Sequence, residues 1–430
     1  MIKLIFIILL LNAYSFAASL KEVIEFSKTN LSIQAKEQQS KVYDNLLSVA
    51  ESSNYPSLDI SYGGTYLNEK PIVYLPINFG GGEMQMQSQN TYKGALTLSY
   101  PLFSGFAISS QIEEAKLKKQ RALLKVEDAK RNLYLNIVHM YSSALSIKHI
   151  ISSEKIALKA TQDGYKKAKE FFDLGMSSSS ELYRIEASLH KIEAELIKRK
   201  KEYKAILNQL SFMSNFKLTD VQKLPNIGVI EFEKLKIEAL QKRPDLLATK
   251  LIIDEAEAKI KLAKSKDYPS IILFAQAVYS GDNPSLNGDG YTNKDKSVAG
   301  FKINYNIFSG FKDSSQIEAA KHSKLTSELM LQSYTNRVNT EIYNSYLTYK
   351  SLFSQKISAQ TQLQAEKKYE RLVHEQFKNQ LTDADVLSRA ISSSSMARSF
   401  LIQIEAKLYT AYAKLLLEID NETFLSSLKN

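Results

Sequence analysis

The chain has 430 residues and a formal net charge of +10, from 56 Lys and Arg against 46 Asp and Glu. It contains no cysteine, which excludes disulfides, thiolate metal sites and a lipid-anchored N-terminal cysteine. The basic residues are dispersed among the acidic ones, and the densest basic run, residues 198–201, lies on a helix whose opposite face is apolar. We therefore expect a solvated helix face and no nucleic-acid partner.

The N-terminus predicts a secretory signal peptide. Lys3 precedes an apolar run at 4–11, and Ser15-Phe16-Ala17 has the small-x-small pattern of a cleavage site. We expect the signal to span 1–17, with cleavage after Ala17 or Ala18; an ordinary buried helix is the alternative. The apolar run is too short for a permanent membrane helix, which needs about 20 residues.

An internal duplication organises the rest of the chain. Residues 103–116 and 308–321 are identical at eleven of fourteen positions, at an offset of 205. Upstream, Tyr-Pro-Ser occurs at 55–57 and again at 268–270, at an offset of 213. These matches divide the chain into repeat 1 (18–213), an equatorial linker (214–231), repeat 2 (232–418) and a C-terminal tail (419–430).

Each repeat has the same predicted order of elements. Tyr-Pro ends the first helix, because proline disfavours helical geometry in the residue before it. In repeat 1 we expect a helix at about 20–51, a β-hairpin at about 57–103, a long helix at 106–172 and a return helix at 178–213. In repeat 2 the corresponding ranges are 232–265, about 270–308, 311–377 and 384–418.

The hairpin strands alternate between apolar and polar residues. In the last strand of repeat 2, Phe301, Ile303, Tyr305 and Ile307 share one face. Strands of about ten residues with one apolar face suit either a membrane-crossing sheet or a soluble sandwich. The segments at 68–90 and 280–296 are rich in Gly, Asn, Asp and Pro and are predicted to be exposed loops.

The long helices are predicted to pack as coiled coils. From Phe311 to the C-terminus the chain contains neither Gly nor Pro. A helix of the predicted length would extend roughly 100 Å at ~1.5 Å per residue. The return helix of repeat 1 has apolar residues at 3-4 spacing, which brings helices together in a left-handed supercoil: Leu182, Ile185, Leu189, Ile192 and Leu196.

The strand number predicts that the chain oligomerises. Beyond the signal no stretch of 18 apolar residues exists, so a membrane crossing would need a closed sheet. Two hairpins supply only four strands, whereas the smallest membrane barrels have eight. Three chains would supply twelve strands.

The sequence resembles the TolC family of outer-membrane efflux proteins. The resemblance rests on the signal peptide, the paired Tyr-Pro-Ser strand entries, the paired Phe-Ser-Gly turns and residues 243–246, Arg-Pro-Asp-Leu, which open repeat 2. It covers essentially the whole mature chain. No single motif is decisive, but their order, spacing and duplication together are specific.

The resemblance implies a fold that is mainly α with β. The family fold is a homotrimer with a 12-stranded β-barrel, four strands per chain, in outer-membrane lipid, above a coiled-coil α-helical barrel in the periplasm. It also implies a passive exit duct for efflux or type I secretion in a Gram-negative bacterium. The periplasmic tip would dock a periplasmic adaptor (membrane fusion) protein bound to an inner-membrane pump of the RND, ABC or MFS type. No cofactor or metal is implied.

The resemblance also assigns an adaptor-docking tip. The family pattern is an aromatic residue, a glycine, a small polar residue and an acidic residue. In repeat 1 the tip residues are Phe172, Leu174, Gly175, Met176, Ser178 and Glu181. In repeat 2 they are Phe377, Gln380, Leu381 and Thr382, where Gln380 replaces the glycine. Either the second turn is one residue shorter, or Asp385 corresponds to Ser180.

Asp385 and Ser388 fall where the family has two aspartates that line the closed channel aperture. Three Asp385 carboxylates in a trimer would favour cations, and the neutral Ser388 would make the constriction less charged than in relatives with both acids. The alternative is that Asp385 only stabilises the start of its helix.

The sequence bears on two other classes of protein. An enzyme is disfavoured because the five histidines stand on predicted helices without ligand spacing or a paired acid, and no catalytic motif is present: His139, His149, His190, His322 and His374. A secreted coiled-coil structural or adhesive protein would explain the helices. It would not explain amphipathic strands at the same point of both repeats.

Overall fold

A computed structural model describes residues 17–289, 291 and 294–428, so the predicted signal peptide lies outside the described residues except for Ala17. The chain forms two compact units, and each is described by itself. Unit 1 comprises the described residues up to Gln38, Leu123–Leu247 and those from Gln332 onward. Unit 2 comprises Gln39–Ala122 and Ala248–Leu331.

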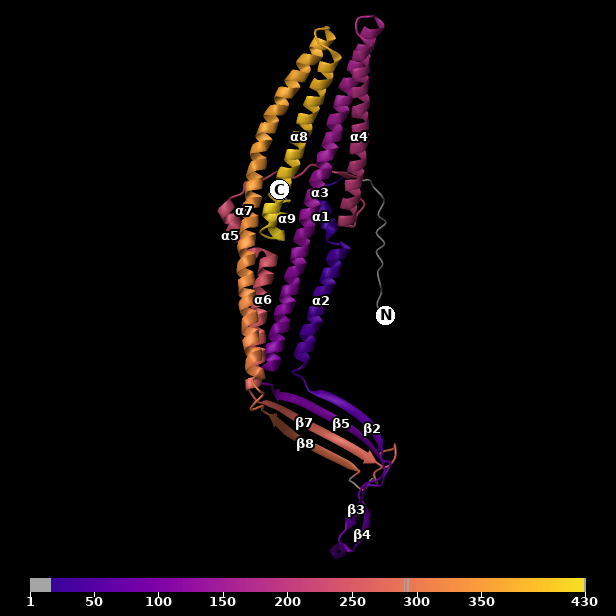
Figure 1. Ribbon diagram of the computed structural model, residues 1–430, viewed down its shortest axis with the longest axis vertical. Coiled ribbons are helices and arrows are strands. Elements are labelled where there is room, and N and C mark those ends of the chain that lie inside the picture. Colours follow the sequence, from indigo (N-terminus) through magenta and orange to yellow (C-terminus); the bar gives the residue numbers. More distant parts are fainter. Residues whose placement is uncertain (1–16, 290, 292–293, 429–430) are drawn as a thin grey trace, which may run out of the picture. The chain divides into compact units, whose positions relative to one another are not determined.

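The elements follow one another in the order labelled in Figure 1. The helices are α1 (Leu20–Ser27), α2 (Leu31–Ser52), α3 (Ala107–Asp173), α4 (Ser179–Ser214), α5 (Phe232–Lys242), α6 (Pro244–Lys264), α7 (Lys312–Lys378), α8 (Ala384–Leu417) and α9 (Asn421–Ser427), with short 3-10 turns at Ile77–Phe79 and Ser265–Asp267. The strands are β1 (Ala17–Ala18), β2 (Ser57–Tyr66), β3 (Ile72–Leu75), β4 (Gly82–Gln85), β5 (Asn90–Phe103), β6 (Asp220–Val221), β7 (Ser270–Gly281) and β8 (Asp295–Asn304).

Unit 2 contains a four-stranded antiparallel sheet in the order β2-β5-β7-β8. Each repeat contributes one hairpin, and the two hairpins meet where β5 pairs with β7, with Leu98 opposite Ala275. β2 and β8 are the outer strands, so each pairs on one side only within the described part of the sheet.

The two faces of this sheet differ in polarity. The register places apolar residues of all four strands on one face: Leu58, Ile60, Leu96, Leu98, Leu273, Ala275, Phe301 and Ile303. The other face is more polar, and there the amide of Gln276 donates to the Thr97 hydroxyl at 3.1 Å. The apolar face is solvent-exposed in the single chain, with Ile60 86% and Phe301 66% exposed. A contiguous exposed apolar surface of this kind marks a contact with lipid or protein.

Two details of the strands differ from the sequence-based expectation. Tyr305 and Ile307 lie beyond β8, because the last residue pair is Ser270 with Asn304, where the partner strand β7 begins. The segment at 68–90 is not a simple loop, since β3 and β4 pair within it as a small separate hairpin. The short β-prone run Ile72–Leu75 explains that hairpin.

The two strand-to-helix turns share one backbone geometry. Gly105 and Phe106 both have positive φ (63° and 68°), as do Gly310 and Phe311 (63° and 63°). At Gly105 a Cβ atom would lie 2.4 Å from the carbonyl oxygen of Ser265, so only glycine fits there. At Gly310 no atom lies within 4 Å of the Cβ position, so the positive φ alone favours glycine there.

Unit 1 contains the distal ends of two helical hairpins, α3 with α4 and α7 with α8 (Figure 1). Near the base of the hairpins a core gathers residues from α1, α3, α4, α8 and α9. Tyr141 is fully buried there, and its hydroxyl lies within hydrogen-bond distance of the carbonyl oxygens of Ala18 (2.8 Å) and Gln222 (3.0 Å). In the linker, β6 pairs in parallel with β1.

The first helix of each repeat is broken, where the sequence predicts a single helix. In repeat 1, α1 and α2 are separated at Asn30, whose side chain accepts from the backbone N–H of Ser32 at 2.9 Å. In repeat 2, α5 ends at Lys242 and α6 begins at Pro244. Proline excludes helical geometry at Arg243, which has ψ 120°. At the offset of 213, Arg243 corresponds to Asn30.

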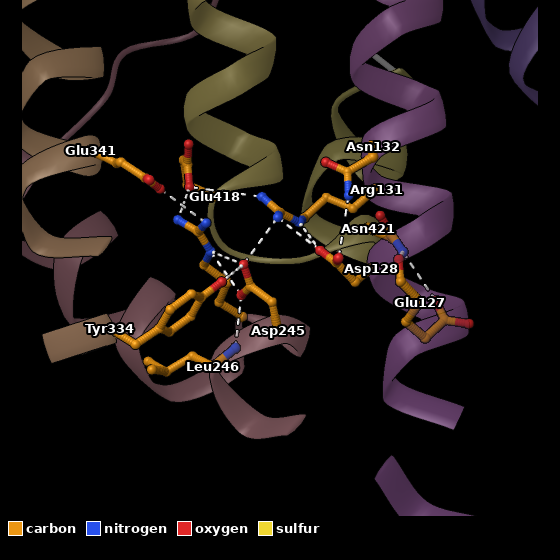
Figure 2. A network of polar contacts seen from close by, with 11 residues as sticks. Glu127, Asp128, Arg131, Asn132, Asp245, Leu246, Tyr334, Glu341, Glu418 and Asn421 are labelled. Atoms are coloured by element: carbon orange, nitrogen blue, oxygen red, sulfur yellow. Dashed lines mark hydrogen bonds and ion pairs between the residues drawn. The ribbon is translucent and has the colours of Figure 1, made fainter. Parts of the chain in front are cut away.

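A buried network of charges surrounds the second break (Figure 2). The Arg243 guanidinium is 5% exposed and contacts Asp245 at 2.9 Å, Glu341 at 3.2 Å and Glu418. Arg131 of α3 also contacts Asp245, at 3.2 Å. The network ties α3, α6, α7 and the end of α8 together inside unit 1.

Candidate functional site

The two hairpin turns at the tip of unit 1 have the same backbone structure. In the α3–α4 turn, the N–H of Met176 donates to the Phe171 carbonyl at 2.8 Å and the N–H of Gly175 to the Phe172 carbonyl at 2.9 Å. These are the hydrogen bonds of a Schellman motif, which ends a helix with one left-handed residue. Gly175 is that residue, with φ 71°.

The α7–α8 turn repeats this geometry with a different side chain. Leu381 donates to the Gln376 carbonyl at 2.8 Å, and Gln380 donates to the Phe377 carbonyl at 3.1 Å. Gln380 takes the left-handed conformation, with φ 60°, at the position of Gly175. A non-glycine residue in this conformation costs about 1–2 kcal/mol, and the surrounding hydrogen bonds hold it in place.

The starts of α4 and α8 show which residues of the two turns correspond. The N-cap residue of α4 is Ser178 and that of α8 is Asp383, which are 205 residues apart. The two turns therefore have equal length, and Asp385 corresponds to Ser180. The alternative of a shorter second turn is wrong.

The tip residues differ in exposure between the repeats. In the first turn, Leu174 and Met176 are 70% and 58% exposed, whereas in the second only Leu381 is comparable, at 75%. Phe172 is partly exposed, but its counterpart Phe377 is 3% exposed. Among the predicted tip residues, Phe377 is thus not available at the surface of the single chain.

Phe377 is buried because the hairpins meet there. It packs edge-on against Phe171, with ring centroids 6.0 Å apart, in a cluster that includes Ile185 and Leu387. The amide of Gln380 also lies 3.8 Å from the sulfur of Met176, so the two turns touch.

The polar tip residues bond within their own turn. The carboxylate of Glu181 accepts from the Ser177 hydroxyl at 2.8 Å, and the hydroxyls of Ser178 and Ser180 are 2.8 Å apart. Thr382 is partly buried beside Leu381. These contacts order the turn and leave its apolar side chains at the surface.

Asp385 lies on the first turn of α8 and forms two ion pairs. Its Oδ2 atom is 2.9 Å from Nη2 of Arg389, one turn further along the same helix, and 3.4 Å from Nη1 of Arg184 of α4. The second contact joins the two hairpins. Neither arginine was singled out as a partner of Asp385 from the sequence, although both occupy the same position of their repeats, at the offset of 205.

Ser388 is partly buried like Asp385, but its side chain differs in its contacts. Its Oγ atom is buried by the chain itself and has no hydrogen-bond partner among the described residues. The residue stands between the buried Leu387 and the exposed Arg389.

No group of three or more His, Asp or Glu side chains among the described residues is arranged to hold a metal ion. Among the same residues, none of the helices combines the length and the apolar character needed to cross a membrane.

Comparisons with known proteins agree with this architecture. A family model described as outer membrane efflux protein matches residues 25–215 and 236–417. Nodulation protein T of Rhizobium leguminosarum bv. trifolii is 21% identical over 324 residues, covering 74% of this chain and 67% of that protein.

Solved structures show the same fold. A membrane protein from Pseudomonas aeruginosa has a TM-score of 0.80 at 14% identity, covering 94% of this chain and 91% of its own. The Campylobacter jejuni CmeC outer membrane channel has a TM-score of 0.76 at 17% identity, covering 95% and 86%. The predicted mainly α fold with a sheet and an internal duplication is confirmed.

The family model matches both repeats and leaves out residues 216–235 between them, so the assignment rests on most of the chain. The adhesive alternative is not favoured, and the family consists of channels and not of enzymes. The chain belongs to the outer membrane efflux protein family and is an outer-membrane efflux channel subunit of the kind that works in tripartite pumps, extending into the periplasm.

Proposed function

We propose that three copies of this chain assemble into one passive exit duct. The observation that supports this most directly is the four-stranded sheet of unit 2, with its exposed apolar face and its outer strands β2 and β8. An outer strand has unpaired N–H and C=O groups, which lipid cannot satisfy. Pairing of β2 in one copy with β8 in the next satisfies them, and three copies supply twelve strands. The helical hairpins would then surround a common axis.

The cysteine-free sequence allows a direct test by disulfide cross-linking. Cysteines replace Ile60 in β2 and, in separate variants, Ala299, Phe301 or Ile303 in β8, which lie on the same face of the sheet. Within one chain β2 and β8 are three strand spacings apart, about 14 Å, which is too far for a disulfide. We expect oxidation in outer membranes to yield covalent dimers and trimers for at least one pair.

A matched control pairs Ile60→Cys with Leu273→Cys in the inner strand β7, which should give no cross-link between chains. Cross-linked species of more than three chains would contradict the trimer. So would a result in which every β2–β8 pair gives only monomers.

We also propose that the tip turns dock a periplasmic adaptor bound to an inner-membrane pump of the RND, ABC or MFS type. The exposed apolar residues Leu174, Met176 and Leu381 support this, because they lie at the surface of hydrogen-bonded turns. The docking residues are those named from the sequence, with the buried Phe377 supporting the turn from within: Phe172, Leu174, Gly175, Met176, Ser178, Glu181, Gln380, Leu381 and Thr382.

Photo-crosslinking in cells tests the docking site. A photoreactive residue at Leu174 or Met176 should cross-link to a protein that mass spectrometry identifies as an adaptor. The same residue at Ile197, 60% exposed on α4 but far from the turn, is the control. Equal cross-linking from Ile197 would contradict docking at the tip.

At the tip we propose Asp385 as the residue that lines the aperture, with Ser388 supporting the packing of α8 behind it. The proposed domain division is the one given above, with a signal peptide at 1–17, repeats at 18–213 and 232–418, the linker at 214–231 and the tail at 419–430. Aligned tip geometry in the two repeats supports this division.

A further inference from the structure

The linker between the two repeats covers a cleft in unit 1. Residues 222–231 connect β6 to α5 without helix or strand geometry and lie against α3, α7 and α8 (Figure 1). Ile227 packs against the cluster that contains Leu408 of α8, and the Tyr349 hydroxyl of α7 donates to the Gly228 carbonyl oxygen at 3.5 Å. The cleft has a volume of about 780 Å³. Sites for small organic molecules typically measure about 300–1,000 Å³.

Aromatic side chains line the helical wall of this cleft. Tyr346, Tyr349 and Phe353 of α7 follow one another at spacings of three and four residues, which places them on one face of the helix. Tyr409 of α8 is 3% exposed and lines the cleft as well. A flat aromatic ligand stacks favourably on such side chains, because ring pairs attract one another beyond the effect of buried area. The wall therefore suits an aromatic ligand.

The charged residues of the cleft leave two cations without an acidic partner. Three lysines, one histidine and one glutamate line it, and Glu405 pairs with Lys356 at 3.3 Å. The other two lysines are Lys223, on the linker, and Lys350, on α7. Neither forms an ion pair with any residue that the structure describes. The ammonium group of Lys350 lies 5.7 Å from the ring centre of Tyr346.

The acids next to the cleft along the chain do not cancel this surplus. Asp220, three residues before the linker lysine, is held by Lys148 at 2.7 Å. Glu231, which follows the last lining residue of the linker, lines a separate cleft together with Lys234. On α7, no Asp or Glu lies within four residues of Lys350. With each of these acids counted beside its own lysine, two ammonium groups stay available to a ligand.

We propose that this cleft binds an aromatic organic anion, with its rings against Tyr349 and Phe353 and its carboxylate attracted by Lys223 and Lys350. Charge complementarity selects an anion over a cation, and the aromatic wall selects flat rings over an aliphatic chain. All of the lining residues belong to unit 1. The site is thus independent of the proposed trimer and of the proposed docking tip.

A fluorine NMR titration of 6-fluoro-2-naphthoate tests the site. The purified full-length protein is held in phosphatidylcholine nanodiscs, and empty nanodiscs give the blank. We expect saturable binding, and binding of the neutral 6-fluoro-2-naphthamide about tenfold weaker, since charge-assisted hydrogen bonds are the stronger ones. The double variant Lys223→Gln/Lys350→Gln should lower the affinity for the naphthoate about tenfold and leave that for the naphthamide unchanged.

Two further variants separate the charges from the rings. Lys198→Gln/Lys200→Gln removes two exposed cations of α4 outside the cleft, so the net charge of the protein changes equally and both affinities should stay the same. Phe353→Ala removes a side chain that is 51% exposed and should weaken both ligands by a similar factor, about threefold or more.

Equal affinity for the naphthoate and the naphthamide, or equal losses in the two double-lysine variants, would overturn the selection of anions by Lys223 and Lys350. Unchanged binding in Phe353→Ala would overturn the aromatic contact. A wild-type protein without saturable binding would overturn the cleft as a ligand site. None of these results bears on the cross-links between β2 and β8, so the duct proposal stands or fails separately.

Discussion

The two repeats of this chain share the backbone geometry of their tip turns and break their first helix at equivalent positions, but the side chains at these two points differ. At the tip, Gly175 and Gln380 adopt the same left-handed conformation, yet Phe172 is partly exposed and Phe377 is buried. At the break in the first helix, repeat 1 uses the neutral Asn30, whereas repeat 2 uses a network of buried charges around Arg243. Hydrogen-bonded turns can therefore keep their shape after duplication while the surfaces they present diverge.

The largest difference between the repeats in the cost of a substitution to the free energy of unfolding should appear at the helix breaks. Arg243→Ala leaves Glu418 and Asp245 buried without their main cation and should cost about 3–5 kcal/mol in the free energy of unfolding. Asn30→Ala removes a helix cap and should cost only about 1 kcal/mol. Urea unfolding in detergent, followed by circular dichroism at pH 7, measures both. Equal costs would show that the charge network adds nothing beyond capping.

The aromatic residues at the tip should also respond unequally. Phe377→Ala opens a cavity between the hairpins and should cost about 3 kcal/mol. Phe172→Ala removes a partly exposed ring and should cost less than about 1 kcal/mol. The same unfolding measurement compares them, and similar losses would mean that Phe172 is buried in the assembled channel.

Low pH should reduce the contribution of Asp245, at the helix break of repeat 2, to the free energy of unfolding. It should not change the contribution of Asn30, at the break of repeat 1. Burial alone would raise the pKa of Asp245, but the hydrogen bond and charge of Arg243 and the Tyr334 hydroxyl lower it below its usual 3.8. A carboxyl with a depressed pKa stabilises the fold above its unfolded value, and this contribution is lost as the pH falls through the folded pKa. Asp245→Asn should therefore cost about 2 kcal/mol at pH 7 and progressively less below pH 3.8.

Asn30→Ala provides the control for this titration, since Asn30 has no ionisable group and its cost should not change over the same range. A cost of Asp245→Asn that is independent of pH would mean that its amide replaces the carboxylate fully.

The smallest changes in stability should follow substitution of the left-handed turn residues, Gly175 and Gln380. Gln380→Gly relieves the strain of positive φ, partly offset by the greater freedom of glycine in the unfolded chain, and should stabilise by about 0.5 kcal/mol. Gly175→Ala introduces the same strain and should destabilise by about 1 kcal/mol. Thermal unfolding of both variants measures the contrast, and a destabilising Gln380→Gly would indicate that the Gln380 contact with Met176 outweighs the backbone strain.

The sequence by itself determined the duplication, the family and the kinds of element, because these depend on local patterns: strand alternation, heptad spacing, and turn residues such as Gly105. It also located the tip turns and Asp385. The sequence could not show which tip residues are exposed. The burial of Phe377, for example, depends on where the second helical hairpin packs against the first.

The tertiary structure alone decided what each charged residue contacts. Arg184 and Asp385 are far apart in the chain, and only the packing of α4 against α8 brings their charges within 3.4 Å. The same holds for Arg243 and Glu418, which meet because the end of α8 lies over the break before α6. Sequence periodicity fixes which face of a helix is apolar, but the pairing of charges depends on distances between helices, which only the packed structure sets.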